Sequence, residues 1–207
     1  MLTVMRLQTL GGPDAARTLR DPNVLAQRRA MLVLPHVTLL AAYAVRLRAA
    51  GPDAKASSWQ VPDFDPLDGG TAARVLFVLE KPGPGIVPGG FVSRDNDTPT
   101  AQAIHAFMHQ AGLPRAETVL WNLVPWWNGT TAIAAGERAA GIEALRTLLP
   151  LLPHLDTAVL VGRTAGAAGP LLGGLRVLRS AHPSPQVRAG FRDRWDAIPE
   201  IWRQARR

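Results

Sequence analysis

Short apolar runs alternate with helix-like segments along the second half of the chain. The runs span Val75–Leu79, Thr118–Trp121, Thr157–Val161 and Leu175–Arg179. The helix-like segments span Thr98–Ala111, Gly136–Leu149, Arg163–Leu172 and Arg188–Arg206. Apolar, β-branched runs separated by helices are typical of a parallel sheet that is covered on both faces. We therefore expect a three-layer α/β/α fold around a mostly parallel, four-stranded sheet.

The N-terminal part of the chain has a different pattern. Its apolar stretch predicts a helix that begins at Asn23 as the N-cap, bends at Pro35 and ends before Gly51-Pro52. We expect residues 1–56 to form a helical arm and residues 57–207 to form the α/β domain.

The stretch at the start of this domain is rich in proline, aspartate and glycine. Such a composition predicts an extended loop over residues 57–70. We expect Trp59 and Phe64 to hold this loop against the core.

Composition narrows the class of protein. The 207 residues are 47% hydrophobic and 19% charged, which excludes a disordered chain and a coiled coil. The formal net charge is +7, and only Lys55 and Lys81 among the 23 basic residues are lysines. Arginine pairs with phosphate through two parallel hydrogen bonds, so a nucleic-acid partner fits this charge. A GC-rich genome would also favour arginine, so charge alone leaves the partner open.

The chain contains no cysteine, which excludes disulfides, thiolate zinc sites and iron–sulfur clusters. None of the five histidines has the HExxH spacing, so we expect no metal and no cofactor. The longest apolar stretch, Ala30–Val45, is interrupted at Pro35 and is shorter than a bilayer span. It also begins too late for a signal peptide, so we expect a cytoplasmic protein without membrane contact.

The residues that follow the four predicted strands are unusual for loops. They are Glu80–Gly85, Asn122–Trp126, Gly162–Ala165 and Ser180–Gln186. In a parallel sheet the carboxyl ends of the strands meet at one edge, where ligands bind. Taken singly, the glycines and prolines could form a turn, Asn122 could cap the chain and His182 could be structural. Their placement at one edge favours a functional site.

Four of these motifs together resemble the uracil-DNA glycosylase superfamily. They are LEKPG after the first strand, WNLVPW at the second, VLVGRTA at the third and HPSPQ after the fourth, with Gly190-Phe191 beyond it. The resemblance covers Arg74–Arg207. It implies an enzyme that flips a nucleotide out of DNA and hydrolyses the N-glycosidic bond of uracil or a related deaminated base.

The resemblance also implies roles for individual residues. His182 would donate to O2 of the departing base, and the Asn122 amide would read uracil O4 and N3–H. Phe91 would stack on the extracted base. Glu80 matches the glutamate of GEAPG-type relatives and is the carboxylate we expect to act on water. Asn96 resembles the asparagine after the stacking aromatic in mismatch-type relatives, and we expect it to be catalytic too.

Lys81 stands where well-known relatives carry an aspartate, an asparagine or a small residue. A cation cannot activate water as a base, so Lys81 could neutralise Glu80, bind phosphate or stabilise the leaving base. Asp95, Asn96 and Asp97 are alternative groups for activating water.

The remaining motif residues are expected to contact DNA. The resemblance implies that the loop with Pro82, Gly83 and Gly85 presses on the DNA backbone and that Ser184 holds a phosphate. We expect Lys81, which departs from the family pattern, to contact DNA as well. Gln186 and Arg188 fall where relatives insert a wedge into the base stack, but no bulky leucine stands there.

We therefore expect a monofunctional uracil-DNA glycosylase of base excision repair, acting as a monomer near the nucleoid. A non-catalytic DNA-binding homologue is the alternative, suggested by Lys81 and by the missing leucine. An unrelated α/β hydrolase or nucleotide-binding enzyme is a third possibility, but no GxSxG, Walker or GxGxxG motif supports it.

Overall fold

A computed structural model describes residues 15–50, 60–85 and 90–206 of the chain. Its centre is a sheet of four parallel strands in the order β4-β2-β5-β6. The strands are β2 (Val75–Leu79), β4 (Thr118–Asn122), β5 (Thr157–Val161) and β6 (Arg176–Ser180). The expected sheet is confirmed, with β4 one residue longer than predicted and β6 displaced by one residue.

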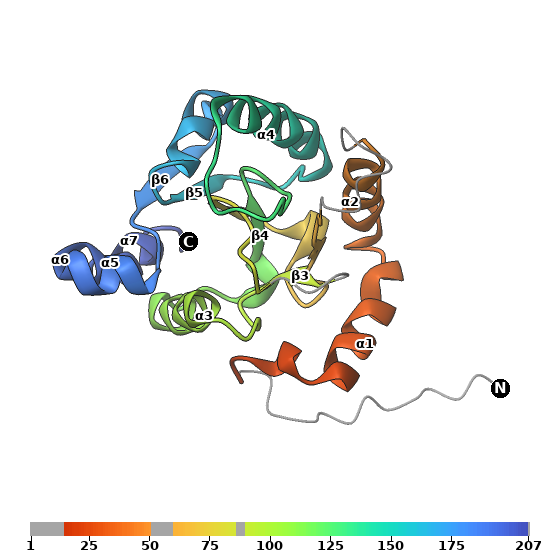
Figure 1. The fold of residues 1–207 in the computed structure, drawn as a ribbon, viewed down its shortest axis with the longest axis horizontal. Coiled ribbons are helices and arrows are strands. Elements are labelled where there is room, and N and C mark those ends of the chain that lie inside the picture. The colour runs from red at the N-terminus through yellow and green to blue at the C-terminus, as the bar shows by residue number, and fades with distance from the viewer. Residues whose placement is uncertain (1–14, 51–59, 86–89, 207) are drawn as a thin grey trace.

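Helices cover both faces of this sheet (Figure 1). One face carries α3 (Pro99–Ala111), packed against α7 (Ile198–Arg203). The other face carries α4 (Ala135–Leu148), packed against the 3-10 helix η6 (Ala165–Leu172). The three-layer α/β/α architecture is therefore confirmed. Helix α3 begins where sequence rules place it, because the Thr98 side chain accepts a hydrogen bond from the backbone N–H of Ala101.

Two predicted helices differ from the structure. Residues 188–206 belong to three short helices: α5 (Pro185–Gly190), α6 (Arg192–Asp196) and α7. The chain leaves helical geometry at Phe191, directly after Gly190, and α7 begins anew with a proline in its first turn. Residues 165–172 form a 3-10 helix because the segment contains two glycines and Pro170, which disfavour a regular α-helix.

A second, two-stranded sheet was not predicted. It pairs β1 (Asp63–Phe64) with β3 (Phe91–Val92) in parallel. The Phe64 ring is fully buried and stacks on Trp121 with 3.8 Å between ring centroids, as the predicted anchoring of this loop requires. Trp59 lies outside the described residues. The short sheet keeps the β3 strand beside the end of β4.

The N-terminal segment consists of two helices, and the second of them packs into the main core. They are α1 (Pro22–Ala30), extended by the 3-10 turn η2 (Met31–Val33), and α2 (Thr38–Ala49), with a bend of 103° between them. The N-cap is Asp21 and not the predicted Asn23, because the Asp21 carboxylate accepts from the backbone N–H of Asn23. The Tyr43 hydroxyl on α2 donates to the Ala144 carbonyl on α4 at 2.6 Å.

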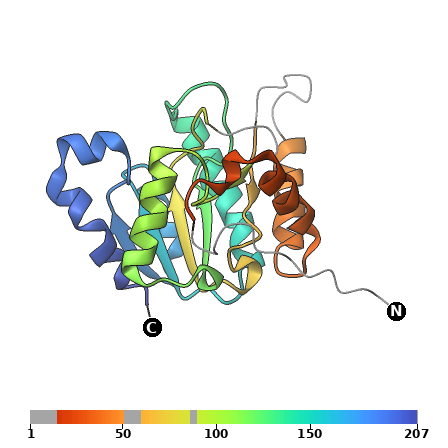
Figure 2. The same cartoon turned by 90° about the horizontal axis from the view of Figure 1, so that it is seen from below.

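This packing joins the predicted arm to the domain (Figure 2). Helix α2 ends at Ala49, as expected for a helix that stops before Gly51-Pro52. Gly51-Pro52 and the predicted boundary at residue 56 lie outside the described residues. Within the described ranges no single helix is both long and apolar enough to span a membrane; residues 22–33 and 38–49 meet that test only as a bent pair, by length and composition.

The other short elements are the 3-10 turns η1 (Thr18–Arg20), η3 (Gly70–Ala72), η4 (Arg115–Glu117) and η5 (Leu149–Leu151).

A buried group of charges ties α1 to the loops beside the sheet. It contains three arginines and three aspartates: Arg28, Arg94, Arg115, Asp65, Asp68 and Asp95. Arg28 lies 2.7 Å from Asp65 and 3.2 Å from Asp95, and Arg115 lies 2.9 Å from Asp95. Burial raises the pKa of Asp68 to about 7, although Arg115 and Arg94 counteract that rise. Buried charges are costly unless they are paired. The pairs of Asp95 with Arg28 and Arg115 therefore hold the loop after β3 in place.

Candidate active site

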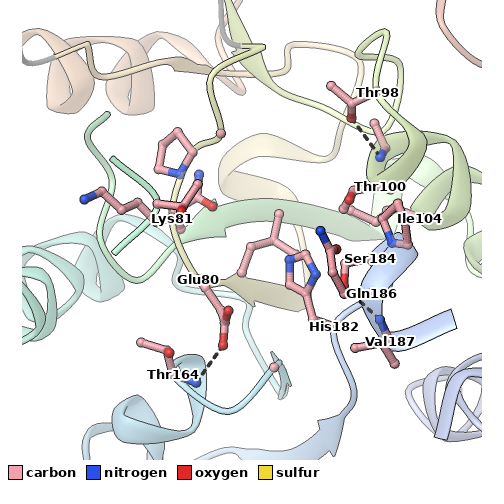
Figure 3. Close-up of a pocket in the computed structure, with 18 of the residues that line it drawn as sticks. Glu80, Lys81, Thr98, Thr100, Ile104, Thr164, His182, Ser184, Gln186 and Val187 are labelled. Carbon is pink, nitrogen blue, oxygen red and sulfur yellow. Dashed lines mark hydrogen bonds between the residues drawn. The ribbon is translucent and has the colours of Figure 1, made fainter. Parts of the chain in front are cut away.

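The carboxyl ends of the parallel strands surround a cavity of about 880 Å³ (Figure 3). Most of the predicted site residues line it: Glu80, Lys81, Pro82, Gly83, Gly85, Asn96, Asn122, His182, Ser184 and Gln186. Two predicted residues, Phe91 and Arg188, are not among its lining residues. The strand-end argument therefore located the cavity correctly.

Glu80 follows β2 and is fixed by the end of β5. Its Oε1 accepts a hydrogen bond from the backbone N–H of Thr164 at 2.7 Å. Gly162 makes this approach possible, since a Cβ atom there would lie 2.6 Å from Oε1 and the residue has a φ of +98°. Among the described residues no donor reaches Oε2 of Glu80. One carboxylate oxygen is thus held and the other is left for a water or a ligand.

His182 follows β6 and faces the same cavity (Figure 3). Burial lowers the pKa of this imidazole, and the negative charge of Glu80 partly opposes that effect. The net pKa lies below the ordinary value of 6.5, so the ring is neutral at pH 7. A neutral imidazole has one N–H donor and one acceptor nitrogen. It can therefore donate a hydrogen bond to a ligand oxygen without first binding a proton.

Asn122 is the last residue of β4 and lies beside the end of β2. Its Cα pairs in register with that of Leu79, and the backbone N–H of Leu123 donates to the Leu79 carbonyl at 2.8 Å. The Val124 N–H donates to the Glu80 carbonyl at 3.0 Å. The Asn122 side chain lines the cavity, and no described residue bonds its amide. Its donor and acceptor are therefore free to read a ligand.

The loop after β3 carries two further predicted residues. The Asn96 side-chain amide donates to the Phe91 carbonyl at 2.8 Å, while Asn96 also lines the cavity. Phe91 is fully buried, and its neighbours Val92 and Ser93 line the cavity in its place. Asn96 thus holds the backbone of this loop. A stacking role for Phe91 and a catalytic role for Asn96 stay predictions.

Lys81 is occupied by protein groups. Its Nζ donates to Asn128 Oδ1 at 2.7 Å, to the Ala132 carbonyl at 3.0 Å and to Glu137 Oε1 at 2.9 Å. Only 3% of the Lys81 side chain is exposed. All three hydrogen bonds of the ammonium therefore go to protein groups. The DNA contact expected for Lys81 stays a prediction.

The partner Glu137 connects three segments. Besides Lys81, its carboxylate accepts from Trp126 Nε1, Asn128 Nδ2 and the backbone N–H of Ala134. Burial alone would raise the pKa of Glu137, but these hydrogen bonds, led by that from Lys81, lower it. The carboxylate is therefore ionised at neutral pH. The Lys81–Glu137 pair holds the loop after β4 against the loop after β2.

The alternative water-activating carboxylates are engaged elsewhere. Asp95 is buried and paired with Arg28 and Arg115, and Asp97 pairs with Arg17 at 3.3 Å. Neither lines the cavity. This corrects the expectation that either could replace Glu80. Among the described residues, no group of three or more histidine, aspartate or glutamate side chains is arranged to hold a metal ion.

The HPSPQ motif forms the entry to α5. The Ser184 hydroxyl caps this helix by accepting from the Val187 N–H at 3.4 Å, and Gln186 is exposed at the cavity. Arg188 is exposed away from the cavity lining, with its guanidinium 5.7 Å from the centre of the Trp195 ring. The DNA contacts predicted for these residues stay predictions.

Some lining residues were not singled out from the sequence. The start of α3 contributes Thr98, Thr100 and Ile104, the loop after β4 contributes Thr131 and Ile133, and α6 contributes Arg194. Only the helix-start signal of Thr98-Pro99 could have placed the first group beside the strand ends. The others depend on the paths of loops, which the sequence does not specify.

The fold and the cavity define an α/β protein with a cavity at the carboxyl ends of its parallel strands, where proteins of this architecture bind ligands. Residues 68–206 match the sequence profile of the Uracil DNA glycosylase superfamily, and the chain belongs to this superfamily. This confirms the resemblance read from the four motifs.

Solved structures were also compared with this chain. The chain is similar to the crystal structure of wild-type UNG from Nitratifractor salsuginis, with 14% identity, a TM-score of 0.43, and coverage of 91% of this chain and 98% of that one. A point mutant of the same protein gives 14% identity, a TM-score of 0.41, and coverage of 87% and 96%. A comparison with curated proteins found no match.

Proposed function

We propose that this protein hydrolyses the N-glycosidic bond of uracil, or of a related deaminated base, in DNA. The observation that carries the proposal is the meeting of Glu80, Asn122 and His182 in one cavity. They come from the ends of β2, β4 and β6, three strands of one parallel sheet. Membership of the superfamily supports the same reaction class.

Each of the three side chains suits one part of this reaction. The Asn122 amide offers a donor to uracil O4 and an acceptor to N3–H, a pattern that cytosine does not match. The neutral His182 ring donates to O2, where negative charge develops as the base departs. Glu80 is held through Oε1, and its other carboxylate oxygen, Oε2, polarises a water. This water attacks the sugar carbon. The bond to the base breaks, the new C–O bond forms, and the water proton passes to the carboxylate.

The position of Lys81 bears on the alternative of a non-catalytic homologue. That alternative rested on a cation beside the presumed general base. The Lys81 ammonium is bound to Glu137, Asn128 and the Ala132 carbonyl, so it does not compete with Glu80 for a water. The geometry therefore favours an enzyme.

An excision assay tests the proposal. Oligonucleotides with one uracil, hypoxanthine or xanthine, single- and double-stranded, are incubated with the protein and then with hot alkali, which cleaves abasic sites. We expect cleavage at uracil, and we expect Asn122→Asp to lose it because a carboxylate offers only acceptors. Asn23→Asp, an exposed substitution on α1, is the matched control and should cleave like wild type. Binding without cleavage by wild type would show the non-catalytic homologue.

A further inference from the structure

Phe191 is an exposed aromatic residue at the mouth of the cavity. Its side chain is 55% exposed, and it lines the cavity together with Arg194. Within the described part of the chain, it is the only aromatic residue among the large apolar side chains that are exposed. Several other rings, such as Phe64, Phe77 and Trp202, are fully buried. An aromatic ring left in water at a ligand site is typical of a binding surface.

The backbone holds this ring between two helices. The Phe191 N–H donates to the Val187 carbonyl at 2.8 Å, and the Phe191 carbonyl accepts from the Trp195 N–H at 3.0 Å. Phe191 is therefore both the last cap of α5 and the first cap of α6. These two hydrogen bonds fix the backbone from which the ring projects.

The segment around the ring, residues 188–196, carries three arginines and two aspartates, Asp193 and Asp196. The Arg194 guanidinium carbon lies 5.0 Å from the Phe191 ring centroid, a cation–π arrangement. Arg188 and Arg192 belong to the same short segment, and Arg192 is paired with Asp196. A flat apolar ring flanked by arginines fits a base attached to a phosphate backbone better than it fits an apolar or a basic peptide.

We propose that Phe191 and Arg194 form a second nucleobase-binding site, which stacks the unpaired base next to the nucleotide held in the cavity. The site rests on the proposed function, because it requires a DNA strand that enters at this mouth. It differs from the wedge position at Gln186 and Arg188. Stacking on a ring needs a neighbouring base that is free of its partner, so the site favours single-stranded or locally opened DNA.

A double-mutant cycle between protein and DNA tests the proposal. The probe is a fluorescent single-stranded oligonucleotide with one 2′-fluoro-2′-deoxyuridine, whose glycosidic bond resists cleavage. Two further probes lack the base on its 5′ or its 3′ side and carry a tetrahydrofuran there. Dissociation constants are measured by anisotropy for wild type, Phe191→Ala, Phe191→Leu and Phe191→Trp.

We expect Phe191→Ala to bind the complete probe about 5- to 100-fold more weakly, the range of one stacked base. One of the two tetrahydrofuran probes lacks the base that stacks on Phe191. On that probe wild type and Phe191→Ala should bind equally. Phe191→Trp should retain binding, and Phe191→Leu should not. Leu39→Ala, a substitution of another 55%-exposed apolar side chain on α2, is the matched control and should bind like wild type.

Three results would overturn the proposal. They are an unchanged affinity of Phe191→Ala, an equal loss on all three probes, and full binding by Phe191→Leu, which would indicate a wedge. Excision of ordinary uracil by wild type is scored separately. If wild type excises uracil but Phe191→Ala weakens binding equally on all three probes, only the second nucleobase-binding site is refuted. If wild type neither excises uracil nor binds the probe, the proposed function is refuted as well.

Discussion

The Glu80 carboxylate is anchored to the backbone N–H of Thr164 at 2.7 Å, across neighbouring strands of the sheet. The anchor depends on Gly162, whose missing side chain leaves room for Oε1. It links the loop after β2 to the loop after β5 on the side of the cavity that also carries His182. A carboxylate held in this way has a fixed direction, which a general base needs.

Replacing this carboxylate should remove catalysis and spare the fold. In Glu80→Gln the amide oxygen can still accept from Thr164, but the side chain can no longer take a proton. We expect single-turnover excision of uracil to fall by about 10²–10⁴, with little change in DNA affinity. Glu143→Gln, an exposed change on α4, should excise at the wild-type rate. A Glu80→Gln rate within a few-fold of wild type would assign water activation elsewhere.

The sheet and its helices could be predicted because their signal is local. The apolar run of β2 is buried on both faces and was bounded correctly, and Thr98-Pro99 marked the start of α3. The two-residue strands β1 and β3 could not be predicted, since each exists only by pairing with the other. The integration of α2 depends on contacts such as that between Tyr43 and Ala144, which are far apart in the sequence.

The candidate site could be predicted in part for the same reason. Glu80, Asn122 and His182 lie at or just after the ends of strands, so topology alone brings them to one edge. The environment of a charged side chain depends on tertiary contacts: Lys81 meets Glu137 and Asp95 meets Arg28 through segments distant in the sequence. Residue type therefore suggested roles for Lys81 and Asp95 without showing the partners that each of them has in the fold.

Lys81 should contribute to stability more than to chemistry. Lys81→Met leaves the partly buried Glu137 carboxylate without its cation but with its other hydrogen-bond donors, and such a loss typically costs about 1–3 kcal/mol of unfolding free energy. Excision per folded molecule should stay within a few-fold of wild type. Urea unfolding followed by circular dichroism measures the first effect and single-turnover assays the second.

Arg146→Met is the matched control for Lys81→Met. It breaks an ion pair with Glu143 whose side chains are well exposed, and such pairs contribute less than about 1 kcal/mol. If Lys81→Met were as stable as wild type but bound DNA a hundredfold more weakly, the ammonium would contact DNA after all.

The titration of His182 should depend on Glu80. Burial lowers the pKa of His182 below 6.5, and the Glu80 charge offsets part of that shift. Neutralising the carboxylate in Glu80→Gln removes the opposing effect, so the pKa of His182 should fall further. NMR titration of the histidine ring protons measures it, with the signal assigned by its loss in His182→Gln. A higher pKa in Glu80→Gln would contradict the arrangement.

Asp68 should make stability depend on pH in a direction opposite to that of an ordinary ion-paired carboxylate. Burial raises its pKa from 3.8 to about 7, so between these pH values the folded protein keeps a proton that the unfolded chain has released. The contribution of this group to stability is therefore present below about pH 4 and is lost as the pH rises to about 7. Asp68→Asn lacks the titration. We expect the unfolding free energy of this variant, relative to wild type, to improve by about 2–3 kcal/mol between pH 5 and pH 8.

Urea unfolding at pH 5, 6, 7 and 8 measures this difference. Asp193→Asn, a change at an exposed aspartate on α6, is the control and should follow wild type across the range. A relative stability of Asp68→Asn that stays constant from pH 5 to pH 8 would show that Asp68 is ionised and paired with Arg115 and Arg94 throughout. In that case the effect of the two arginines on the pKa of Asp68 would outweigh the effect of burial. Asp68 would then behave like Asp65, whose pKa is lowered by Arg115 and Arg28 in spite of its burial.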